Sequence, residues 1–551
     1  MTQRSLLVLA ALLVGCDKAV EEDPTADCIV IDTAELSTGG TLTAGCYLLN
    51  EDLDIDGDVV LEDGVEVFVA AGMWIEVRTS GSLDVQGNEV GVVLQGQSDD
   101  VDSWFGLFVD GEMTFNKLTV IGGGDTSYGG VHAGVHLTGG SITGTDLWIE
   151  QSTEYGFYAH SATAPVVIEG LAIYGAATPA LLGLQQGTGL SGALEMDGGV
   201  VLLEDGDLAS DGVLPALDFA SFRYDWNIDA ALTLSPGLTL TMHEDSRFDV
   251  DETGQLLSMG TETEGVVIQG AQALPGFWKG LTIRNGGAIV SELYYTKISD
   301  AGDRDGTPDY SYGALELDEG EAILSGVTLS GNAGFALSIE SEVSGGIVVE
   351  NCVFTDNERS IVTSAPAAGV FDDTNVFSGN DETMIVVAER YPYVKTESTW
   401  SVTNVPYFVR EDLDIEDSLG IMPGARLIFE EHAGLDIFGT GLLTVGDTAG
   451  DPVVMEGSRN QVALWKGIRF NNNSDSNLLA NVTFKDAGSG WNSAGRSEST
   501  LYLEDSNLSL DSVTVLDSGL HDLWADGEST VSCTNVTMTM DGSDEASICE
   551  P

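Results

Sequence analysis

Basic residues are scarce in this chain, and their scarcity argues against several kinds of partner. Lysine and arginine together number 20 among 551 residues, against 89 aspartates and glutamates, which gives a formal net charge of −69 at pH 7. A protein that binds nucleic acid neutralises phosphates with basic side chains, so we expect no nucleic acid partner. Anionic membrane surfaces and polyanionic sugars should also be repelled over most of the molecule.

Long apolar runs and helical patterns are missing as well. After Cys16, no apolar run approaches the roughly 20 residues that a membrane-spanning helix needs. No stretch has the apolar periodicity of an amphipathic helix. Instead, 68 glycines separate short runs rich in valine, leucine and threonine, a composition that predicts strands and turns.

The N-terminal segment Met1–Cys16 resembles the export signal of bacterial lipoproteins. One basic residue, Arg4, precedes an apolar segment that ends in Leu13-Val14-Gly15-Cys16. In that family the signal is removed before the cysteine, which is then acylated. The resemblance therefore implies that Cys16 is a lipid-modified N-terminus, and several acyl chains together anchor a protein stably. The alternative is an ordinary signal peptide that happens to end in cysteine.

A lipid anchor implies a location in the cell envelope. Residues 17–27 would then be a short tether that holds the folded body close to the membrane. We expect the outer membrane or the cell surface rather than the inner membrane. The membrane itself, reached through the lipid, is one expected partner, and a polysaccharide or another surface protein is a further candidate.

One pattern occurs three times along the chain. A Val-Val-x-x-Gly strand is followed, at the same short distance after its glycine, by a tryptophan. Similarity at a long period indicates a solenoid, a propeller or tandem domains. We divide the body into modules at residues 28–210, 211–395 and 396–551. The three copies of the pattern are Val92–Gly96 with Trp104, Val266–Gly270 with Trp278, and Val453–Gly457 with Trp465.

The residues after each tryptophan extend the pattern to Trp-x-Gly-Ile/Leu, as in Trp465-Lys466-Gly467-Ile468. This pattern resembles the right-handed β-helix proteins of the pectate-lyase-like superfamily, and most of all the surface lipoproteins built from such coils. The resemblance implies an all-β fold, a right-handed parallel β-helix solenoid with three internal modules. With roughly 23 residues per coil and about 4.8 Å between coils, it would have about 22 coils. The first module departs from the pattern, because Phe105 stands where the other modules have lysine.

Five cysteines remain after Cys16. Cys28 and Cys46 lie near the start of the folded body, and Cys533 and Cys549 lie near its end. In an oxidising compartment we expect each close pair to form a disulfide that staples a terminal coil. Metal binding is the alternative, but the spacings do not suit it. Cys352 lies in an apolar strand, where we expect a buried free thiol.

An acidic loop is the best candidate for a cofactor, which would be Ca²⁺. Asp303, Asp305 and Asp309 follow Asp300 in a segment that contains Gly306 and Pro308 and has no counterpart in the other modules. Loop acids that do not alternate with apolar residues are freer to converge on an ion. The alternative is a solvated turn.

Two repeated dipeptides, Trp278-Lys279 and Trp465-Lys466, are candidates for sugar contact through an aromatic ring and a neighbouring cation. Alternatively, each tryptophan covers a coil corner and each lysine offsets nearby carboxylates. His132 and His136 have the spacing of a helical zinc pair. On a strand, however, their side chains would be about 13 Å apart, too far for one metal ion.

These features favour a non-enzymatic surface lipoprotein that serves in adhesion, carbohydrate contact or envelope structure. The alternative function is a Ca²⁺-assisted polysaccharide lyase or glycoside hydrolase. We find no catalytic constellation in the sequence: it has neither the Gly-His-Gly nor the Arg-x-Lys of polygalacturonase-like enzymes. With so many acids, pairs at any spacing arise by chance, so sequence spacing alone identifies no carboxylate pair.

A titration tests the acidic loop. If Asp300, Asp303, Asp305 and Asp309 bind Ca²⁺, millimolar Ca²⁺ will raise the thermal unfolding midpoint, because an ion that binds only the folded chain stabilises it. Mg²⁺ at the same ionic strength is the control for general screening of the acidic surface. An unchanged midpoint removes the specific ion site.

Overall fold

Alternation of apolar and polar residues builds the strands of this chain. In β7 (Trp74–Val77), Ile75 and Val77 are buried, whereas Trp74 and Glu76 are half-exposed on the other side, as the two-residue period of a strand requires. The computed structural model describes residues 25–98, 103–125, 130–159, 166–197, 200–204, 206–221, 225–287, 289–302, 313–342, 345–388, 391–491, 498–542 and 546–549.

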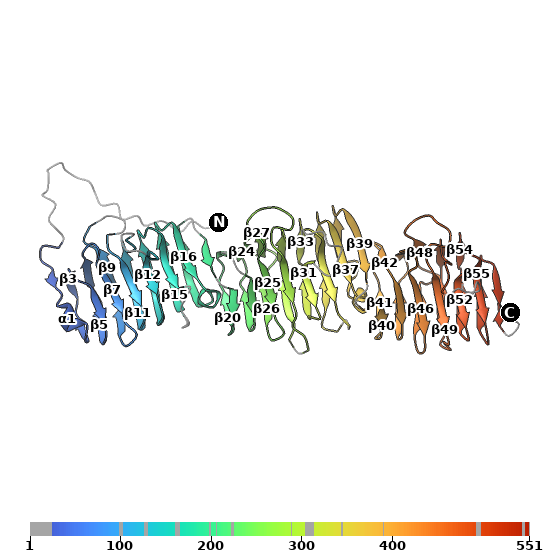
Figure 1. Cartoon of the computed structure of the whole chain (residues 1–551), viewed down its shortest axis with the longest axis horizontal. Helices are drawn as coiled ribbons and strands as arrows, with labels where there is room; N and C mark the ends of the chain where they lie inside the picture. Colours follow the sequence, from blue (N-terminus) through green and yellow to red (C-terminus); the bar gives the residue numbers. More distant parts are fainter. Residues whose placement is uncertain are drawn as a thin grey trace.

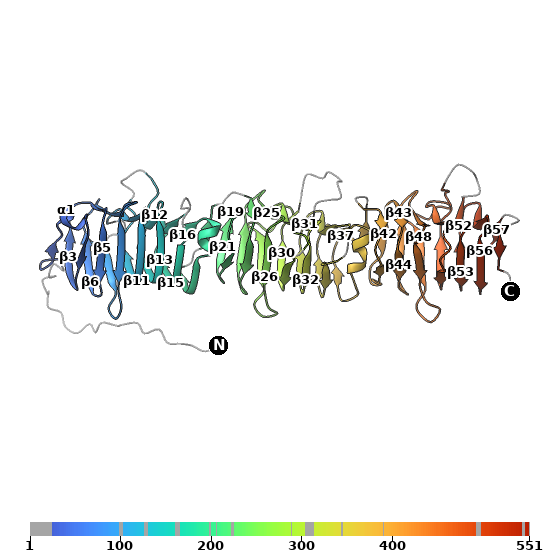
Figure 2. The ribbon, with the colours of Figure 1, turned by 90° about the horizontal axis from the view of Figure 1, so that it is seen from below.

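Every strand pairing among these described residues is parallel, and together the strands build an elongated rod. Figures 1 and 2 show the strands crossing the long axis of the rod and following one another along it in sequence order. Parallel partners lie well apart in the sequence, as Leu107 and Val135 do. The prediction of an all-β fold built from parallel strands is confirmed, and long parallel sheets of this kind are consistent with a β-helix or solenoid.

The two longest sheets overlap in the middle of the chain. The 14-stranded sheet contains β4 (Leu53–Ile55), β7 (Trp74–Val77), β10 (Gly106–Val109), β12 (Ala133–Leu137), β14 (Tyr155–Ala159), β16 (Thr178–Leu182), β18 (Val201–Leu203), β21 (Asp218–Ser221), β24 (Thr239–Met242), β27 (Val266–Gly270), β30 (Thr296–Ser299), β33 (Thr328–Ser330), β36 (Val353–Thr355) and β38 (Val376–Ser378). The 13-stranded sheet contains β19 (Gly206–Leu208), β22 (Trp226–Ile228), β25 (Arg247–Val250), β28 (Gly280–Ile283), β31 (Gly313–Asp318), β34 (Phe335–Glu340), β37 (Arg359–Thr363), β39 (Glu382–Val387), β42 (Tyr407–Val409), β45 (Arg426–Phe429), β48 (Val453–Gly457), β51 (Val482–Lys485) and β54 (Thr514–Leu516).

The other sheets cover the remaining sides. The 11-stranded sheet contains β1 (Ile29–Val30), β2 (Gly40–Leu42), β3 (Gly45–Leu49), β5 (Asp58–Glu62), β6 (Val65–Val69), β8 (Ser82–Gln86), β9 (Val92–Gly96), β11 (Glu112–Ile121), β13 (Ser141–Glu150), β15 (Val166–Tyr174) and β17 (Leu190–Met196). The six-stranded sheet contains β20 (Gly212–Leu214), β23 (Ala231–Leu234), β26 (Gln255–Met259), β29 (Ser291–Tyr294), β32 (Ala322–Ser325) and β35 (Val348–Glu350).

Two seven-stranded sheets lie in the C-terminal part of the chain. The β40 sheet contains β40 (Tyr393–Val394), β43 (Asp412–Ile415), β46 (Gly434–Phe438), β49 (Gly467–Asn471), β52 (Ser499–Glu504), β55 (His521–Asp526) and β57 (Met540–Gly542). The β41 sheet contains β41 (Ser398–Trp400), β44 (Ser418–Ile421), β47 (Leu442–Val445), β50 (Asn477–Ala480), β53 (Asn507–Asp511), β56 (Thr530–Thr534) and β58 (Ser547–Ile548).

Helical segments of the described chain are short: α1 (Thr33–Leu36), α2 (Leu184–Gly187) and the 3-10 turn η1 (Pro366–Val370). None of them is long and apolar enough to cross a membrane. Inward side chains from all the sheets meet in one continuous apolar core that extends from Leu36 to Val531. Each strand therefore buries its apolar residues largely together with those of the strands stacked before and after it.

Bends between strands stack in columns as the strands do. Four successive strands of the 14-stranded sheet, β30, β33, β36 and β38, are each followed by a residue with left-handed backbone: Asp300, Gly331, Asp356 and Gly379, with φ between 56° and 68°. Glycine, aspartate and asparagine adopt this conformation at the least cost. This requirement explains why those residue types separate the strands in the sequence.

Buried asparagines connect neighbouring coils directly after that column of bends. Asn332 Nδ2 donates to Asn357 Oδ1 at 2.9 Å, and Asn357 Nδ2 donates to Asn380 Oδ1 at 3.0 Å. Asn357 also donates to the carbonyl of Leu329 at 2.9 Å. Because each amide both donates and accepts, the ladder satisfies polar groups that would otherwise be buried at a cost.

The three modules are not related by a simple shift along the rod. The Val-Val-x-x-Gly strands β9, β27 and β48 belong to the 11-, 14- and 13-stranded sheets, respectively. The strands after the module tryptophans, β10, β28 and β49, belong to the 14-stranded, 13-stranded and β40 sheets. The sheet that carries the tryptophan strand in one module thus carries the Val-Val-x-x-Gly strand in the next. Each module is turned by one side of the rod relative to the previous module.

Each module tryptophan occupies the same buried position in a connection between strands. Trp104, Trp278 and Trp465 are 0%, 1% and 0% exposed. Each indole N–H donates to a backbone carbonyl 2.8 Å away: those of Ile121, Ser299 and Lys485, respectively. The tryptophans are therefore structural anchors of the repeat.

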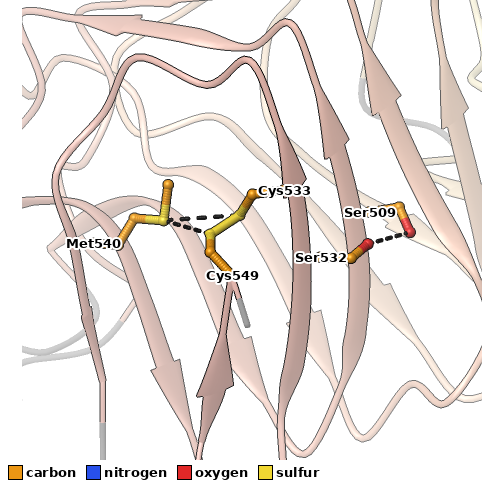
Figure 3. Close-up of a disulfide and its surroundings, with 5 residues drawn as sticks. All are labelled: Ser509, Ser532, Cys533, Met540 and Cys549. Atoms are coloured by element: carbon orange, nitrogen blue, oxygen red, sulfur yellow. Dashed lines mark hydrogen bonds between the residues drawn. A yellow bond between two sulfur atoms is a disulfide. The ribbon is translucent and has the colours of Figure 1, made fainter. Parts of the chain in front are cut away.

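Disulfides close both ends of the described body. Cys28 pairs with Cys46, with their Cα atoms 4.7 Å apart, and Cys533 pairs with Cys549, with their Cα atoms 5.0 Å apart. Figure 3 shows the C-terminal pair, with the Met540 sulfur beside it. The terminal coils have a neighbour on one side only, so a covalent link there limits fraying of the ends.

Truncation of one anchor tests its structural role. We expect Trp278→Ala to lower the free energy of unfolding by about 3–5 kcal/mol, because it leaves a large cavity and removes a buried hydrogen bond. Lys279→Ala, at the exposed next residue, is the matched control and should change stability by less than about 0.5 kcal/mol. Equal effects of the two substitutions in denaturant unfolding would contradict the assignment.

Candidate functional site

Equivalent outer faces of the three modules can be compared residue by residue. The strand after each module tryptophan and its parallel neighbours place one row of side chains on the outside, because alternate residues of a strand point away from the core. The rows are Glu76–Phe108–His136–Tyr158 in the first module, Asp249–Thr282–Glu316–Ser338 in the second and Asp436–Arg469–Tyr502–Trp524 in the third.

The first module has a hollow on this face, which we call the first hollow. It has a volume of about 260 Å³. β7, β10 and β12 form its floor, and the connections before β10 and β12 form its sides. The lining residues are Trp74, Glu76, Phe105, Phe108, Asp125, Gly130, Val131, His132 and His136.

Aromatic rings make up most of the wall of the first hollow. Trp74 and Phe105 are stacked, with centroids 6.0 Å apart and 30° between their planes. Along the outer row, the Phe108 and His136 rings are 5.3 Å apart, and the His136 and Tyr158 rings are 4.6 Å apart, edge to face. Rings on adjacent parallel strands follow each other at the strand spacing, so the row runs along the rod axis.

An apolar patch continues the outer row beyond the rings. The ring centroids of Tyr155 and Tyr158 are 5.6 Å apart. Leu181 and Leu202 take the next two positions of the row. These side chains form a small cluster of their own, separate from the main core. Tyr158 and Leu181 are 7% and 4% exposed, so the cluster is packed against its own neighbours and supports the rings from one side.

The polar groups around Trp74 hold its ring in place. Its indole N–H donates to Asp54 Oδ1 at 3.1 Å, and Arg78 binds the other oxygen of Asp54 at 2.5 Å. Arg78 also lies 3.5 Å from Glu76. Burial raises the pKa of Glu76, while the nearby Arg78 opposes that shift.

Tyr158 is 7% exposed, and burial raises its pKa to about 12. Its hydroxyl therefore stays protonated and can donate a hydrogen bond at every physiological pH. An apolar aromatic wall with a few polar groups at its rim is the usual composition of a ligand site. The chemistry available here is stacking and hydrogen bonding.

The corresponding face of the third module is filled by its own chain. Trp491 lies against Gly434, the residue that stands where Trp74 stands in the first module; a Cβ atom on Gly434 would be 2.7 Å from the Trp491 ring. Lys466 forms an ion pair with Asp412 and lies 5.0 Å above the Trp491 ring. Burial raises the pKa of Asp436 on this face to about 6.

The face of the second module is polar. Arg284 lies 3.1 Å from Asp249, 3.8 Å from Asp251 and 3.5 Å from Asp318. Burial, reinforced by the charges of Asp318 and Glu340, raises the pKa of Glu316 to about 7. Among the described residues, the face of the first module combines an open hollow with a wall of rings.

The sugar-contact interpretation of Trp278 and Trp465 is wrong, because both rings are buried and cannot stack against a ligand. Lys279 is exposed beside its tryptophan. Lys466 is held by Asp412 and Trp491 as described above. The alternative interpretation of the sequence, in which the repeated tryptophans are structural, matches these positions.

Asp300 is a turn residue rather than an isolated loop acid. Its backbone is left-handed, and its carbonyl accepts the N–H of Phe277 at 2.8 Å. Asp486 has the same conformation in the third module, where its carbonyl accepts from Leu464. Asp300 thus has a structural counterpart in the third module, whereas the segment that follows it, residues 303–312, lies outside the described residues.

Other predicted site residues lie outside the described part of the chain: Asp303, Asp305 and Asp309 of the acidic loop, and the lipidation residue Cys16. Among the described residues, no group of three or more His, Cys, Asp and Glu side chains is arranged to hold a metal ion. The predicted disulfide residues are joined as Cys28–Cys46 and Cys533–Cys549, and Cys352 is a buried free thiol.

The sequence alone does not reveal the aromatic wall, although it contains one signal. Phe105 departs from the repeat, and it lines the first hollow where the other modules have lysine. His132 and His136, whose strand spacing argues against a shared metal ion, both line the hollow. The His136 ring packs between Phe108 and Tyr158.

The raised pKa of Glu316 predicts a pH-dependent stability. The fold favours the protonated carboxyl, so its contribution is fully present below the ordinary pKa of 4.5 and is lost as pH rises through about 7. Glu316→Gln should therefore match the wild type near pH 4.5 and exceed it by up to about 3 kcal/mol at pH 8. Glu262→Gln, at an exposed turn of the same module, removes the same charge and should show no such pH-dependent gain.

Comparison of the chain with protein-family models, with curated proteins and with solved structures finds no match. The features that bear on function are accordingly those of the molecule itself. They are the first hollow, its row of rings along the rod axis and the acidic surface around it.

Proposed function

We propose that this protein is an envelope-anchored surface lipoprotein that contacts carbohydrate through the first hollow, without catalysing a reaction. The observation that carries the proposal is the wall of rings in the first hollow, where the stacked Trp74 and Phe105 accompany Phe108 and His136. The apolar faces of sugar rings pack against aromatic side chains, and their hydroxyl groups bond to polar groups at the rim.

The proposal includes the finer architecture. The chain is a right-handed parallel β-helix of about 22 coils, arranged in modules 28–210, 211–395 and 396–551. The continuous core and the uniformly parallel pairing support this arrangement. A lipid on Cys16 holds the rod at the outer membrane or cell surface, with residues 17–27 as the tether.

Charge favours a neutral saccharide over an anionic one. The chain carries a formal net charge of −69, and Glu76 and Asp125 line the hollow itself. A uronate or sulfate would be repelled on approach. A neutral polysaccharide avoids this repulsion, and its hydroxyl groups can donate to the carboxylates of the hollow.

Contact rather than cleavage fits the groups at the rim. Catalysis by a Ca²⁺-assisted lyase or a glycoside hydrolase depends on an acid and a base aimed at the scissile bond. In the first hollow, Glu76 and Asp54 are bound by Arg78, and Asp54 holds the Trp74 ring. These carboxylates serve to position the aromatic wall.

Binding to soluble polysaccharides tests the function. In affinity gels and calorimetry with xyloglucan, galactomannan, β-glucan and dextran, at least one should bind the wild type. Trp74→Ala combined with Phe108→Ala should weaken binding at the first hollow by tenfold or more, about 1.4 kcal/mol, because two stacking rings are lost. Pectate and alginate should not bind.

The matched control is Trp148→Ala. Trp148 is 40% exposed on the 11-stranded sheet and packs 4.9 Å from Tyr174, away from the first hollow. Its loss should leave binding unchanged. Two results would refute the assignment to the first hollow. One is an equal loss of carbohydrate binding in the control. The other is carbohydrate binding that does not change when Trp74 and Phe108 are replaced.

A further inference from the structure

A second hollow lies near the boundary between the second and third modules. Its volume is about 350 Å³, and it lies on the outer face of the 13-stranded sheet, across β34, β37, β39, β42 and β45. The lining residues are Phe335, Arg359, Glu382, Met384, Val386, Phe408, Arg410 and Glu430. Apart from Phe335, whose Gly334-Phe335 pair recurs as Gly156-Phe157, these positions do not stand out in the sequence.

An outward apolar row crosses the second hollow, and its two middle members, Val386 and Phe408, line the hollow. Val362, Val386, Phe408 and Ile428 are register partners on adjacent strands. Val362 and Val386 form an apolar cluster with Phe335, and Met384 and the half-buried Phe408 pack against this cluster, outside the main core. The apolar row of the first module, from Phe108 to Leu202, is the comparable feature on the 14-stranded sheet.

Arginine–glutamate pairs form the rim. Arg359 lies 3.4 Å from Glu382, and its guanidinium is 5.3 Å above the Phe335 ring. Arg410 bonds to Glu430 at 3.1 Å. Arg359 and Arg410 are two of only 20 basic residues in the chain, and both border this one hollow.

We propose that the second hollow is a second binding site for a neutral saccharide chain. The rim alternates arginine donors with glutamate acceptors, and hydroxyl groups, which both donate and accept, complement such a rim. The two arginines are already neutralised by their glutamate partners, so the site has no excess positive charge to attract an anion. Phe408 and Met384 supply the apolar surface for the sugar faces. This inference rests on the proposed function for its class of ligand.

The positions of the two hollows make the rod bivalent. The first hollow lies on the 14-stranded sheet and the second on the 13-stranded sheet, so the two face different sides. β38 of the 14-stranded sheet comes directly before β39, which lines the second hollow. Ten strand steps along the 14-stranded sheet separate β38 from β12, which lines the first hollow. At about 4.8 Å per step, the axial separation is roughly 50 Å. One straight glycan cannot follow both surfaces, so the protein joins two chains.

Cross-linking distinguishes two sites from one. The wild type mixed with the soluble neutral polysaccharide that it binds best should increase light scattering, because each rod links two chains. Phe408→Ala should reduce this increase in light scattering at least tenfold. The polysaccharide should still retard this variant in affinity gels, because the first hollow still binds it. Arg410→Gln is a second variant with an intact apolar floor and should act in the same direction.

Ile428→Ala is the matched control. Ile428 is the next residue in the same outer row and half-buried, but it does not line the hollow. Its loss should leave both scattering and retardation unchanged. Thermal midpoints of all variants confirm that each is folded.

The outcomes separate the two proposals. Unchanged scattering in Phe408→Ala and Arg410→Gln overturns the second site, as does a complete loss of binding when only Trp74 and Phe108 are replaced. If Phe408→Ala alone abolishes all binding, the second site stands, whereas the proposed function of the first hollow fails. If none of the neutral polysaccharides binds the wild type, or if only pectate or alginate binds, both proposals are overturned.

Discussion

In-register stacking of parallel strands is the constraint on which the rest of this structure depends. A residue of one strand lies directly beside its register partner on the next, so each position along a coil becomes a column along the rod. Inward columns build one core from Leu36 to Val531. Outward columns can be acidic or aromatic at little cost to the core, because they share only the backbone with it. Surface chemistry is thus free to change along the rod while the coils stay alike.

The same constraint governs the corners. A bend that stacks on other bends must repeat their backbone conformation, as Asp300, Gly331, Asp356 and Gly379 do. Polar groups buried at a corner are satisfied by their counterparts one coil away, as in the Asn332–Asn357–Asn380 ladder. At the two ends of the described body, where a strand has a described neighbour on one side only, disulfides join the chain to itself.

Local signals in the sequence are enough to predict strands, turns, parallel stacking and the cysteine pairs. They are not enough to find either hollow. Phe108, His136 and Tyr158 are separated by unequal intervals, and nothing in the sequence shows that each interval is one circuit of the chain. The repeated tryptophans draw attention because they recur, but recurrence in a stacked fold marks structural anchors. The informative residue is Phe105, where the repeat is broken.

Each module is rotated about the rod axis by one side relative to the module before it. This rotation has a consequence for chains that gain or lose a module. Removal or duplication of one module would shift every later segment to a neighbouring side, because the tryptophan strands occupy the 14-stranded, 13-stranded and β40 sheets in turn. The second hollow, for example, would point in a different direction relative to the N-terminal coil and the first hollow. Module number in this architecture therefore sets an angle as well as a length.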